Sequence, residues 1–261
     1  MKAIELINDL TKNIEVPGVS CDYVKAGDTG KTIKKVAVSM FATVDVVKRV
    51  KEWGADMLIV HEPTYYDHME NIPTMTKTIE LKKKLIEDSG IVVYRYHDHM
   101  HYMDYDAITE GMLHYLGLTG KVEKTKWFAS YVFTSDKEVS ASELAEKMQN
   151  DLGIAHVKIA GGTDFKTKKI AACFGTPGGV FEMLCDDDID IVLTGEACEW
   201  KLGEYARDSY ALGINKSLIV MGHIGSERDG MKYLCEKMKK KYAEFETEYF
   251  ECSEVYSYKD T

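Results

Sequence analysis

The sequence of 261 residues predicts an α/β fold of two duplicated, pseudo-symmetric halves, because two parts of the chain repeat one order of strands and helices. Residues 34–40 and 56–62 correspond to residues 168–174 and 190–196 at a constant offset of 134 positions. A helical segment lies between the strands in each copy, at 46–53 and at 180–184. Strand, helix and strand in this order indicate a βαβ unit with parallel strands.

A third strand follows in each copy, at 91–97 and at 217–223, now at an offset of 126. Helices are expected before these strands, at 78–88 and at 200–212. Each half is therefore predicted to be β-α-β-α-β followed by a loop that contains a histidine. The alternative is that two α/β segments merely share a generic composition, but the polar residues aligned at the strand ends favour duplication.

We place the first half at 1–120 and the second at 121–261, with residues 121–167 inserted between the copies. The insertion is expected to contain a strand at 130–135 and a helix at 140–152. Ser140 suits the N-cap of that helix, with Glu143 at the capping-box position. Residues 1–10 have the spacing of an amphipathic helix and not of a signal peptide. The C-terminal tail is expected to pack on the first half.

Charge and composition exclude several classes of protein. The 33 basic and 43 acidic residues give a net charge of −10, which is wrong for a protein that binds nucleic-acid phosphates. No stretch approaches the ~20 apolar residues that cross a bilayer, so no membrane partner and a cytoplasmic location are expected. The six cysteines form no CxxC pair, and Cys173, Cys185 and Cys235 are expected to be reduced core thiols.

Histidines and carboxylates gather after the predicted strands. They occur at 61–62, 97–101, 195–196 and 222–227, and six of the eight histidines lie in or just after these loops. Ligands of parallel α/β sheets bind beyond the carboxyl ends of the strands. Imidazole nitrogens and carboxylate oxygens that converge there indicate a metal site.

The sequence spacing of these residues indicates which side chains can act together at a metal ion. Pro63 restricts Glu62 to an extended backbone, so His61 and Glu62 could reach two different metals; a capping glutamate beside a buried histidine is the alternative. Spacing of four puts His97 and His101 on one face, as it does residues 223 and 227. His68 and His99 are expected to be surface histidines and are left out of the site.

The glycine-rich turn at 175–179 follows a strand and opens a helix. Its amides could cradle an anion, although a plain tight turn is equally compatible with the sequence.

Four segments together resemble the signatures of the NIF-three-like proteins, some of which are named type-two GTP cyclohydrolase I homologues. The segments are residues 59–63, 97–101, 193–196 and 222–227. The turn at 175–179 and residues 111–118 also resemble family segments, and the resemblance covers roughly residues 34–230. It implies a duplicated α/β fold of NIF-three-like type, a dinuclear metal site in the cleft between the halves and a toroidal homohexamer.

The resemblance implies one set of metal ligands, namely His61, Glu62, His101, His223 and Glu227. The chain departs from the family pattern twice. The family usually has two consecutive histidines where this chain has His61 and Glu62, and an aspartate where it has His101. The set still holds three imidazoles and two carboxylates, so two divalent ions (zinc, iron or manganese) are expected. The family's N-terminal aspartate-asparagine motif is not recognisable at 19–27.

The leading functional hypothesis is a dinuclear metal-dependent hydrolase that acts on a nucleotide or another small phosphorylated molecule. His97 is then the candidate proton shuttle. Glu196 is predicted to orient a ligand or to bind substrate. The alternatives are a non-catalytic metal-binding regulator or oligomeric scaffold, and a redox iron protein.

Overall fold

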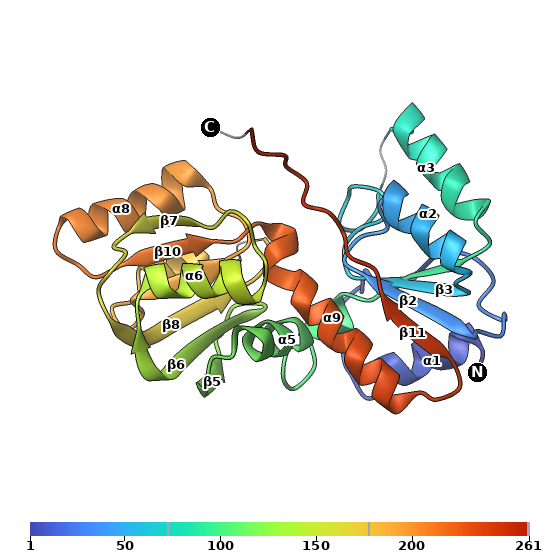
Figure 1. Ribbon diagram of the computed structural model, residues 1–261, viewed down its shortest axis with the longest axis horizontal. Coiled ribbons are helices and arrows are strands. Elements are labelled where there is room, and N and C mark those ends of the chain that lie inside the picture. Colours follow the sequence, from blue (N-terminus) through green and yellow to red (C-terminus); the bar gives the residue numbers. More distant parts are fainter. Residues whose placement is uncertain (72–73, 177, 260–261) are drawn as a thin grey trace. The chain divides into compact units, whose positions relative to one another are not determined.

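Two β-sheets organise the chain, and each belongs to one of two compact units (Figure 1). The structure is a computed structural model that describes residues 1–71, 74–176 and 178–259. Unit 1 consists of residues 1–107 and 231–253, and unit 2 consists of residues 108–230 and the tail from Glu254. The predicted α/β class, with one sheet in each of two parts, is confirmed.

Unit 1 contains the following elements, in chain order: α1 (Ala3–Thr11), β1 (Val24–Ala26), β2 (Lys35–Ser39), α2 (Val44–Trp53), β3 (Met57–Val60), α3 (Lys77–Glu87), β4 (Val92–Arg95), α4 (Asp98–His101) and β11 (Glu246–Tyr249). The helix α9 (His223–Lys241) begins in unit 2 and ends in unit 1. The expected amphipathic N-terminal helix is confirmed as α1.

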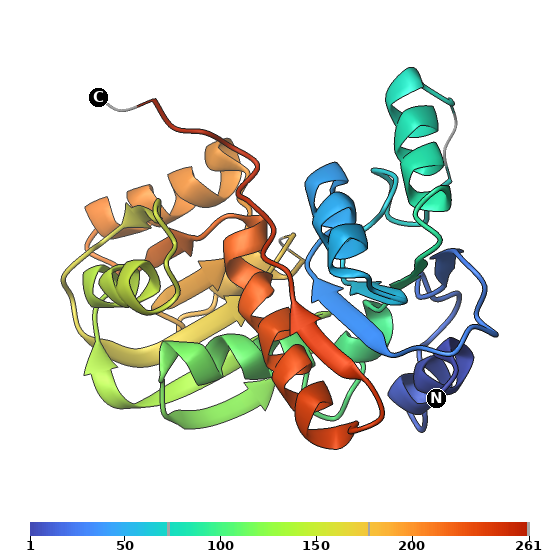
Figure 2. The same ribbon diagram turned by 45° about the vertical axis from the view of Figure 1, so that its right-hand side comes forward.

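The sheet of unit 1 has the strand order β1-β4-β3-β2-β11. The four neighbouring strands β4, β3, β2 and β11 are parallel to one another. The remaining edge strand, β1, is antiparallel to β4. Every residue of β3 and β4 is buried, which explains why both strands are apolar apart from Arg95 at the end of β4. Figures 1 and 2 show α2 on one face of this sheet and α1 on the other.

Local sequence sets the ends of α2. The Thr43 hydroxyl accepts a hydrogen bond from the amide of Val46, as expected for an N-cap threonine. Gly54 ends the helix with a φ of 81°, which glycine adopts without strain. Between these ends, Val46 and Val50 are completely buried, so α2 has one apolar face in the interior of unit 1.

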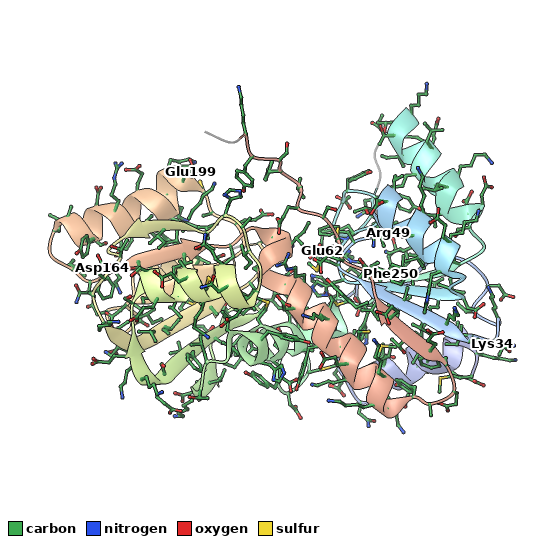
Figure 3. The ribbon with its side chains drawn as sticks, viewed as in Figure 1. Lys34, Arg49, Glu62, Asp164, Glu199 and Phe250 are labelled. Atoms are coloured by element: carbon green, nitrogen blue, oxygen red, sulfur yellow. The ribbon has the colours of Figure 1, made fainter. Side chains whose placement is uncertain are left out.

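The last strand, β11, comes from the far end of the sequence and pairs in parallel with β2 (Figure 2). The Ser39 hydroxyl donates to the carbonyl oxygen of Phe250 at 2.7 Å. Arg49 donates to the carbonyl oxygen of Glu251 at 2.5 Å, and its guanidinium lies 5.9 Å from the ring of Phe250 (Figure 3). The C-terminal segment is thus an integral edge of unit 1.

Unit 2 contains the following elements: α5 (Ala107–Leu116), β5 (Gly120–Lys124), β6 (Ser130–Val139), α6 (Ala141–Asp151), β7 (Lys158–Gly161), β8 (Thr167–Cys173), α7 (Val180–Leu184), β9 (Ile191–Thr194), the π-helix η1 (Glu199–Gly203), α8 (Glu204–Ala211) and β10 (Ser217–Val220). Its sheet has the order β5-β6-β8-β9-β10-β7, with β8, β9 and β10 parallel. The core of unit 2 includes Val180, Val192 and Leu218, all nearly inaccessible to solvent.

The sheet register reproduces the first predicted offset. Val36 pairs with Met57 in unit 1, and Ile170 pairs with Ile191 in unit 2. Both members of the second pair lie 134 positions after those of the first. Glu62 and Glu196 therefore follow corresponding strands, β3 and β9, by the same number of residues.

The offset of 126 for the third strand is wrong by one residue. Val92 pairs with Met57 and Ser217 pairs with Ile191, so the strands correspond at an offset of 125. The loop after β10 consequently has one more residue before its histidine than the loop after β4. A mostly apolar run without alternation, as in β4 and β10, matches almost equally well in both registers, whereas a one-residue slip reverses the direction of every side chain.

Several local predictions can be compared with the structure. The helix at 140–152 is confirmed as α6, and Ser140 and Glu143 form the predicted capping box. The strand expected at 130–135 continues to Val139, and the helix expected at 200–212 is divided into η1 and α8. All six cysteines are free thiols, but Cys185 is exposed, so its assignment to the core is wrong.

Lys82 on α3 is a buried lysine, and we expect it to make stability depend on pH. Its ammonium group donates to the carbonyl oxygen of Thr64 at 2.5 Å, and burial lowers its pKa to about 8. Between pH 8 and about 10.4 the unfolded chain keeps the proton that the folded chain has lost. The unfolded state binds more protons in this window, so the free energy of unfolding rises with pH, by up to roughly 3 kcal/mol.

Lys82→Met should remove that rise, measured as urea-unfolding free energy from pH 8 to pH 10 against the wild type. Lys84→Met is the matched control on the same helix, because the Lys84 side chain is exposed and pairs with Asp88. Equal slopes for Lys82→Met and the wild type would show that Lys82 is solvated in the folded protein.

Among the described residues, no helix combines the length and the apolar character that crossing a lipid bilayer requires.

Candidate metal-binding site

Two predicted site residues of unit 1 directly follow the strand β3. The amides of His61 and Glu62 both donate to the carbonyl oxygen of Met40, at 3.1 Å, which fixes the backbone at this edge of the sheet. His61 is completely buried and Glu62 is 7% exposed. Glu62 is labelled in Figure 3. His97 follows the neighbouring parallel strand β4, so all three side chains start from the same edge.

Three imidazoles meet at this edge. The ring centroids of His61 and His97 are 4.4 Å apart, those of His61 and His101 are 5.0 Å apart, and those of His97 and His101 are 4.7 Å apart. One ring nitrogen of each lies within 4.8 Å of the others, close enough for a single ion to reach all three. Burial, with His97 and His101 beside it, holds the pKa of His61 well below its usual value. Neutral imidazole is the form that binds metal.

Oxygen acceptors fix the orientation of two of these rings. Nδ1 of His61 lies 3.1 Å from the carbonyl oxygen of Tyr96, which can only accept, so Nδ1 carries the proton. Nδ1 of His101 lies 2.6 Å from the carboxylate of Asp106, which is fully buried. When the neutral ring carries its proton on Nδ1, the lone pair is on Nε2, which is the nitrogen that would bind a metal ion. Metal-ligating histidines typically have such an acceptor on the other nitrogen.

His97, the predicted proton shuttle, lies between two carboxylates. Its Nδ1 is 2.9 Å from an oxygen of Asp98, and its Nε2 is 4.0 Å from an oxygen of Glu62. His97 as a whole is 7% exposed. This arrangement allows Asp98 to hold the Nδ1 proton while Nε2 is available to take up or release another.

Unit 2 brings the remaining predicted residues together. Glu196 follows β9, and His223 begins α9 with Glu227 one turn later on the same face. Nδ1 of His223 lies 2.8 Å from a carboxylate oxygen of Glu196, and its Nε2 lies 3.2 Å from one of Glu227. Glu196 is therefore placed to orient His223, which is one of the two roles predicted for it.

Residue 175, which lies next to the carboxylate of Glu227, has to be a glycine. Gly175 has a φ of +69°, and a Cβ there would lie 2.3 Å from a carboxylate oxygen of Glu227. The first residue of the turn at 175–179 thus packs directly against this carboxylate. Pro177 lies outside the described residues, so the predicted anion cradle formed by the whole turn stays a prediction.

Sequence reasoning missed two buried carboxylates that support the site. Asp106 is five residues beyond His101, and its spacing alone gave no signal. Asp22 is 75 residues before His97, yet its carboxylate accepts from the amides of His97, Asp98 and His99 at 2.7–2.9 Å. His99 also directs its Nδ1 to Asp22 at 2.7 Å and is only partly exposed, whereas His68 is exposed as expected.

Cys21 does not have the properties of a catalytic nucleophile. It is completely buried, and burial raises the pKa of its thiol to about 12. A reactive cysteine needs the opposite environment, one that stabilises the thiolate.

We expect Asp106→Asn to weaken metal binding by about 10- to 100-fold, because it removes the acceptor that fixes the tautomer of His101. The dissociation constant can be measured by competition with a chelator of known affinity. Asp104→Asn is the matched control, since Asp104 is exposed and lies two residues away. An unchanged dissociation constant for Asp106→Asn would mean that His101 is not held through its Nδ1 when metal binds.

Comparison with known proteins gives a consistent result. The model of the Duf34/NIF3 (NGG1p interacting factor 3) family matches residues 8–256. A "GTP cyclohydrolase 1 type 2 homolog" of Clostridium perfringens is 24% identical over 250 residues, which cover 91% of this chain and 90% of that protein. "NGG1-interacting factor 3" of Saccharomyces cerevisiae is also 24% identical, with 71% of this chain and 69% of that protein covered.

Among solved structures, a protein named ybgI, of unknown function, superposes with a TM-score of 0.78 at 20% identity. The match covers 97% of this chain and 99% of that one. At this identity the likeness supports the fold alone.

Proposed function

The chain belongs to the Duf34/NIF3 family, and on that premise we propose that it is a metal-dependent hydrolase that uses two divalent ions. The proposed ligands are the five predicted from sequence: His61, Glu62, His101, His223 and Glu227. Zinc, iron and manganese all suit a set of imidazoles and carboxylates. The proposed substrate is a nucleotide or another small phosphorylated molecule.

The main support for this proposal is the set of oxygen acceptors that orient the three histidine ligands. His61, His101 and His223 each direct Nδ1 to an oxygen acceptor, at 3.1, 2.6 and 2.8 Å. An oxygen acceptor on Nδ1 orients each of the three rings, as is typical of metal-ligating histidines. Glu62 and Glu227 add buried carboxylates, which suit divalent ions. The donor set therefore fits the metals that the family resemblance implies.

Bound metal ions would supply Lewis acidity, which polarises a substrate oxygen and makes water more acidic. The chain's own residues would control the proton. Asp98 fixes the tautomer of His97, so that Nε2 can accept a proton from water and later pass it to the leaving group. Glu196 would hold His223 in place throughout.

The charge of the chain and the name of a relative both bear on the substrate class. The net charge of −10 disfavours anionic substrates at a distance, but bound dications would reverse the field locally. The name of the Clostridium perfringens relative points in the same direction, toward nucleotides. We therefore propose a nucleotide-like substrate for this chain.

The test has two steps. Metal content is measured first by mass spectrometry on protein purified without added metal, and the protein is then loaded with zinc, iron or manganese in turn. Each loaded form is assayed for turnover of a panel of nucleotides and sugar phosphates. We expect turnover with at least one metal, and its loss in His97→Gln while the two ions of the proposed ligand set are retained. Stoichiometric metal binding without turnover for any metal would contradict the hydrolase.

That negative result would instead support the second candidate, a non-catalytic metal-binding regulator or oligomeric scaffold. The yeast relative, which is named for an interaction and not for a reaction, favours this candidate. The same ligands would serve it, because structural metal sites use the same side chains but leave no coordination position open.

A further inference from the structure

Four donor side chains of unit 1 form a second group beside the predicted ligands. Cys21, His68, His97 and Asp98 each offer one atom, and these atoms all lie within 4.8 Å of one another. None of the four belongs to the proposed ligand set, but His97 and Asp98 are the proton-transfer pair of the proposed function. A cation held here would replace the hydrogen bond of that pair, so the cation and the proton transfer are alternative uses of it. From this geometry we propose that unit 1 holds a further divalent cation, of the zinc type, on one sulfur, two nitrogens and one oxygen.

The donor types favour such an ion. A thiolate and two imidazoles suit borderline metals such as Zn²⁺ and Co²⁺, and a carboxylate completes a four-coordinate site. Zinc bonds of about 2.0–2.3 Å place tetrahedral ligand atoms roughly 3.3–3.8 Å apart. The longest distances between the four donor atoms must therefore shorten by about 1 Å when an ion binds. His68 can supply this movement because it is the exposed member, whereas Cys21, His97 and Asp98 are buried.

The three buried donors are already tied together. Asp98 accepts from the amide of Cys21 at 2.8 Å and from the hydroxyl of Ser20 at 3.0 Å. The carboxylate of Asp22 accepts from the amides of His97 and Asp98 at 2.7 and 2.8 Å. Two segments almost 80 residues apart in sequence are thus fixed against each other with their donors side by side. Such supporting contacts are typical of residues that orient metal ligands.

The local charges allow a dication. Arg95 opposes it, since its guanidinium lies 3.4 Å from Nδ1 of His68. The carboxylates of Asp22 and Asp98 and the thiolate of Cys21 would outweigh that single positive charge. Binding exchanges the S–H bond of Cys21 for a metal–sulfur bond and releases one proton to solvent, so affinity should rise with pH.

Cobalt provides a test that is independent of activity. Thiolate bound to Co²⁺ gives an intense near-ultraviolet charge-transfer band, which imidazoles and carboxylates do not give. The protein is titrated with Co²⁺ after exchange of the exposed Cys185 and the partly exposed Cys198 for serine. We expect the band in this background and its loss on adding Cys21→Ser. Cys235→Ser is the matched control, because Cys235 is also buried in unit 1 but lies outside the group.

A second variant protects the test against misfolding. His68→Ala changes an exposed residue and should weaken Co²⁺ binding, followed through the same band, by at least about tenfold. Absence of the band at saturating Co²⁺, its persistence in Cys21→Ser, or an unchanged affinity in His68→Ala would each overturn the proposal. The band should remain in His223→Ala with Glu227→Gln, which separates this cation from those of the proposed function.

Discussion

His223→Ala and Glu227→Gln are each expected to lower metal affinity by more than about 100-fold, and together to abolish stoichiometric binding of the ions that the proposed hydrolase needs. Loss of a residue that only orients a ligand already costs 10- to 100-fold, so loss of a ligand atom should cost more. Glutamine fills the volume of Glu227, which packs against Gly175, and therefore tests the carboxylate charge without opening a cavity. Metal content by mass spectrometry and affinity by chelator competition measure the effect.

Glu236→Gln is the control for this pair, because it neutralises a carboxylate on the same helix, α9, outside the predicted ligands. Circular dichroism checks that each variant keeps its fold. Unchanged metal content in the double variant would mean that the ligand set is wrong. A loss in Glu236→Gln as large as in Glu227→Gln would point to the general charge of the helix and not to coordination.

Arg95→Met is expected to lower the free energy of unfolding of the metal-free protein by about 3–5 kcal/mol. Arg95 ends β4 and is completely buried. It donates to the carbonyl oxygens of His61, at 3.0 Å, and of His68, and it lies 3.9 Å from the carboxylate of Glu62. Methionine replaces the aliphatic stem but leaves those carbonyl groups and the charge of Glu62 without their cation in a buried place.

Urea unfolding measures the total effect, and hydrogen exchange of the β3 and β4 amides locates it within unit 1. Arg49→Met serves as the control, because the ion pair of Arg49 with Asp45 is exposed and should contribute no more than about 1 kcal/mol. A loss for Arg95→Met no larger than that of Arg49→Met would show that water reaches the Arg95 guanidinium in the folded protein.

The fold could be predicted from the sequence where the two copies of the repeat align without a gap. The gapless offset of 134 gave the correct strand register, because the apolar strands and the residues after them are conspicuous in both copies. The third strand was placed one residue too far along in the second copy. The alignment of His97 with His223 shifted the third strands by one residue. The structure pairs Val92 with Met57 and Ser217 with Ile191, so these strands correspond at an offset of 125.

The candidate site could be predicted only where its residues follow strands. His61, Glu62 and Glu196 occupy such positions, and the chain brings each next to a neighbour expected from sequence. The supporting partners could not be found in this way. Asp22 reaches His97 across 75 positions, and Arg95 was not recognised as a buried cation inside an apolar strand. Contacts of this kind depend on tertiary structure and leave no local pattern.

The place of β11 at the edge of the unit 1 sheet affects how the protein can be synthesised. During translation β2 emerges early, but its parallel neighbour is Glu246–Tyr249, so this sheet edge stays open until residues 246–249 have left the ribosome. The continuous stretch 108–230 of unit 2 is complete before that moment. Emergence of residues 246–249, and not the completion of residues 1–107, is therefore the event that allows the first sheet to close.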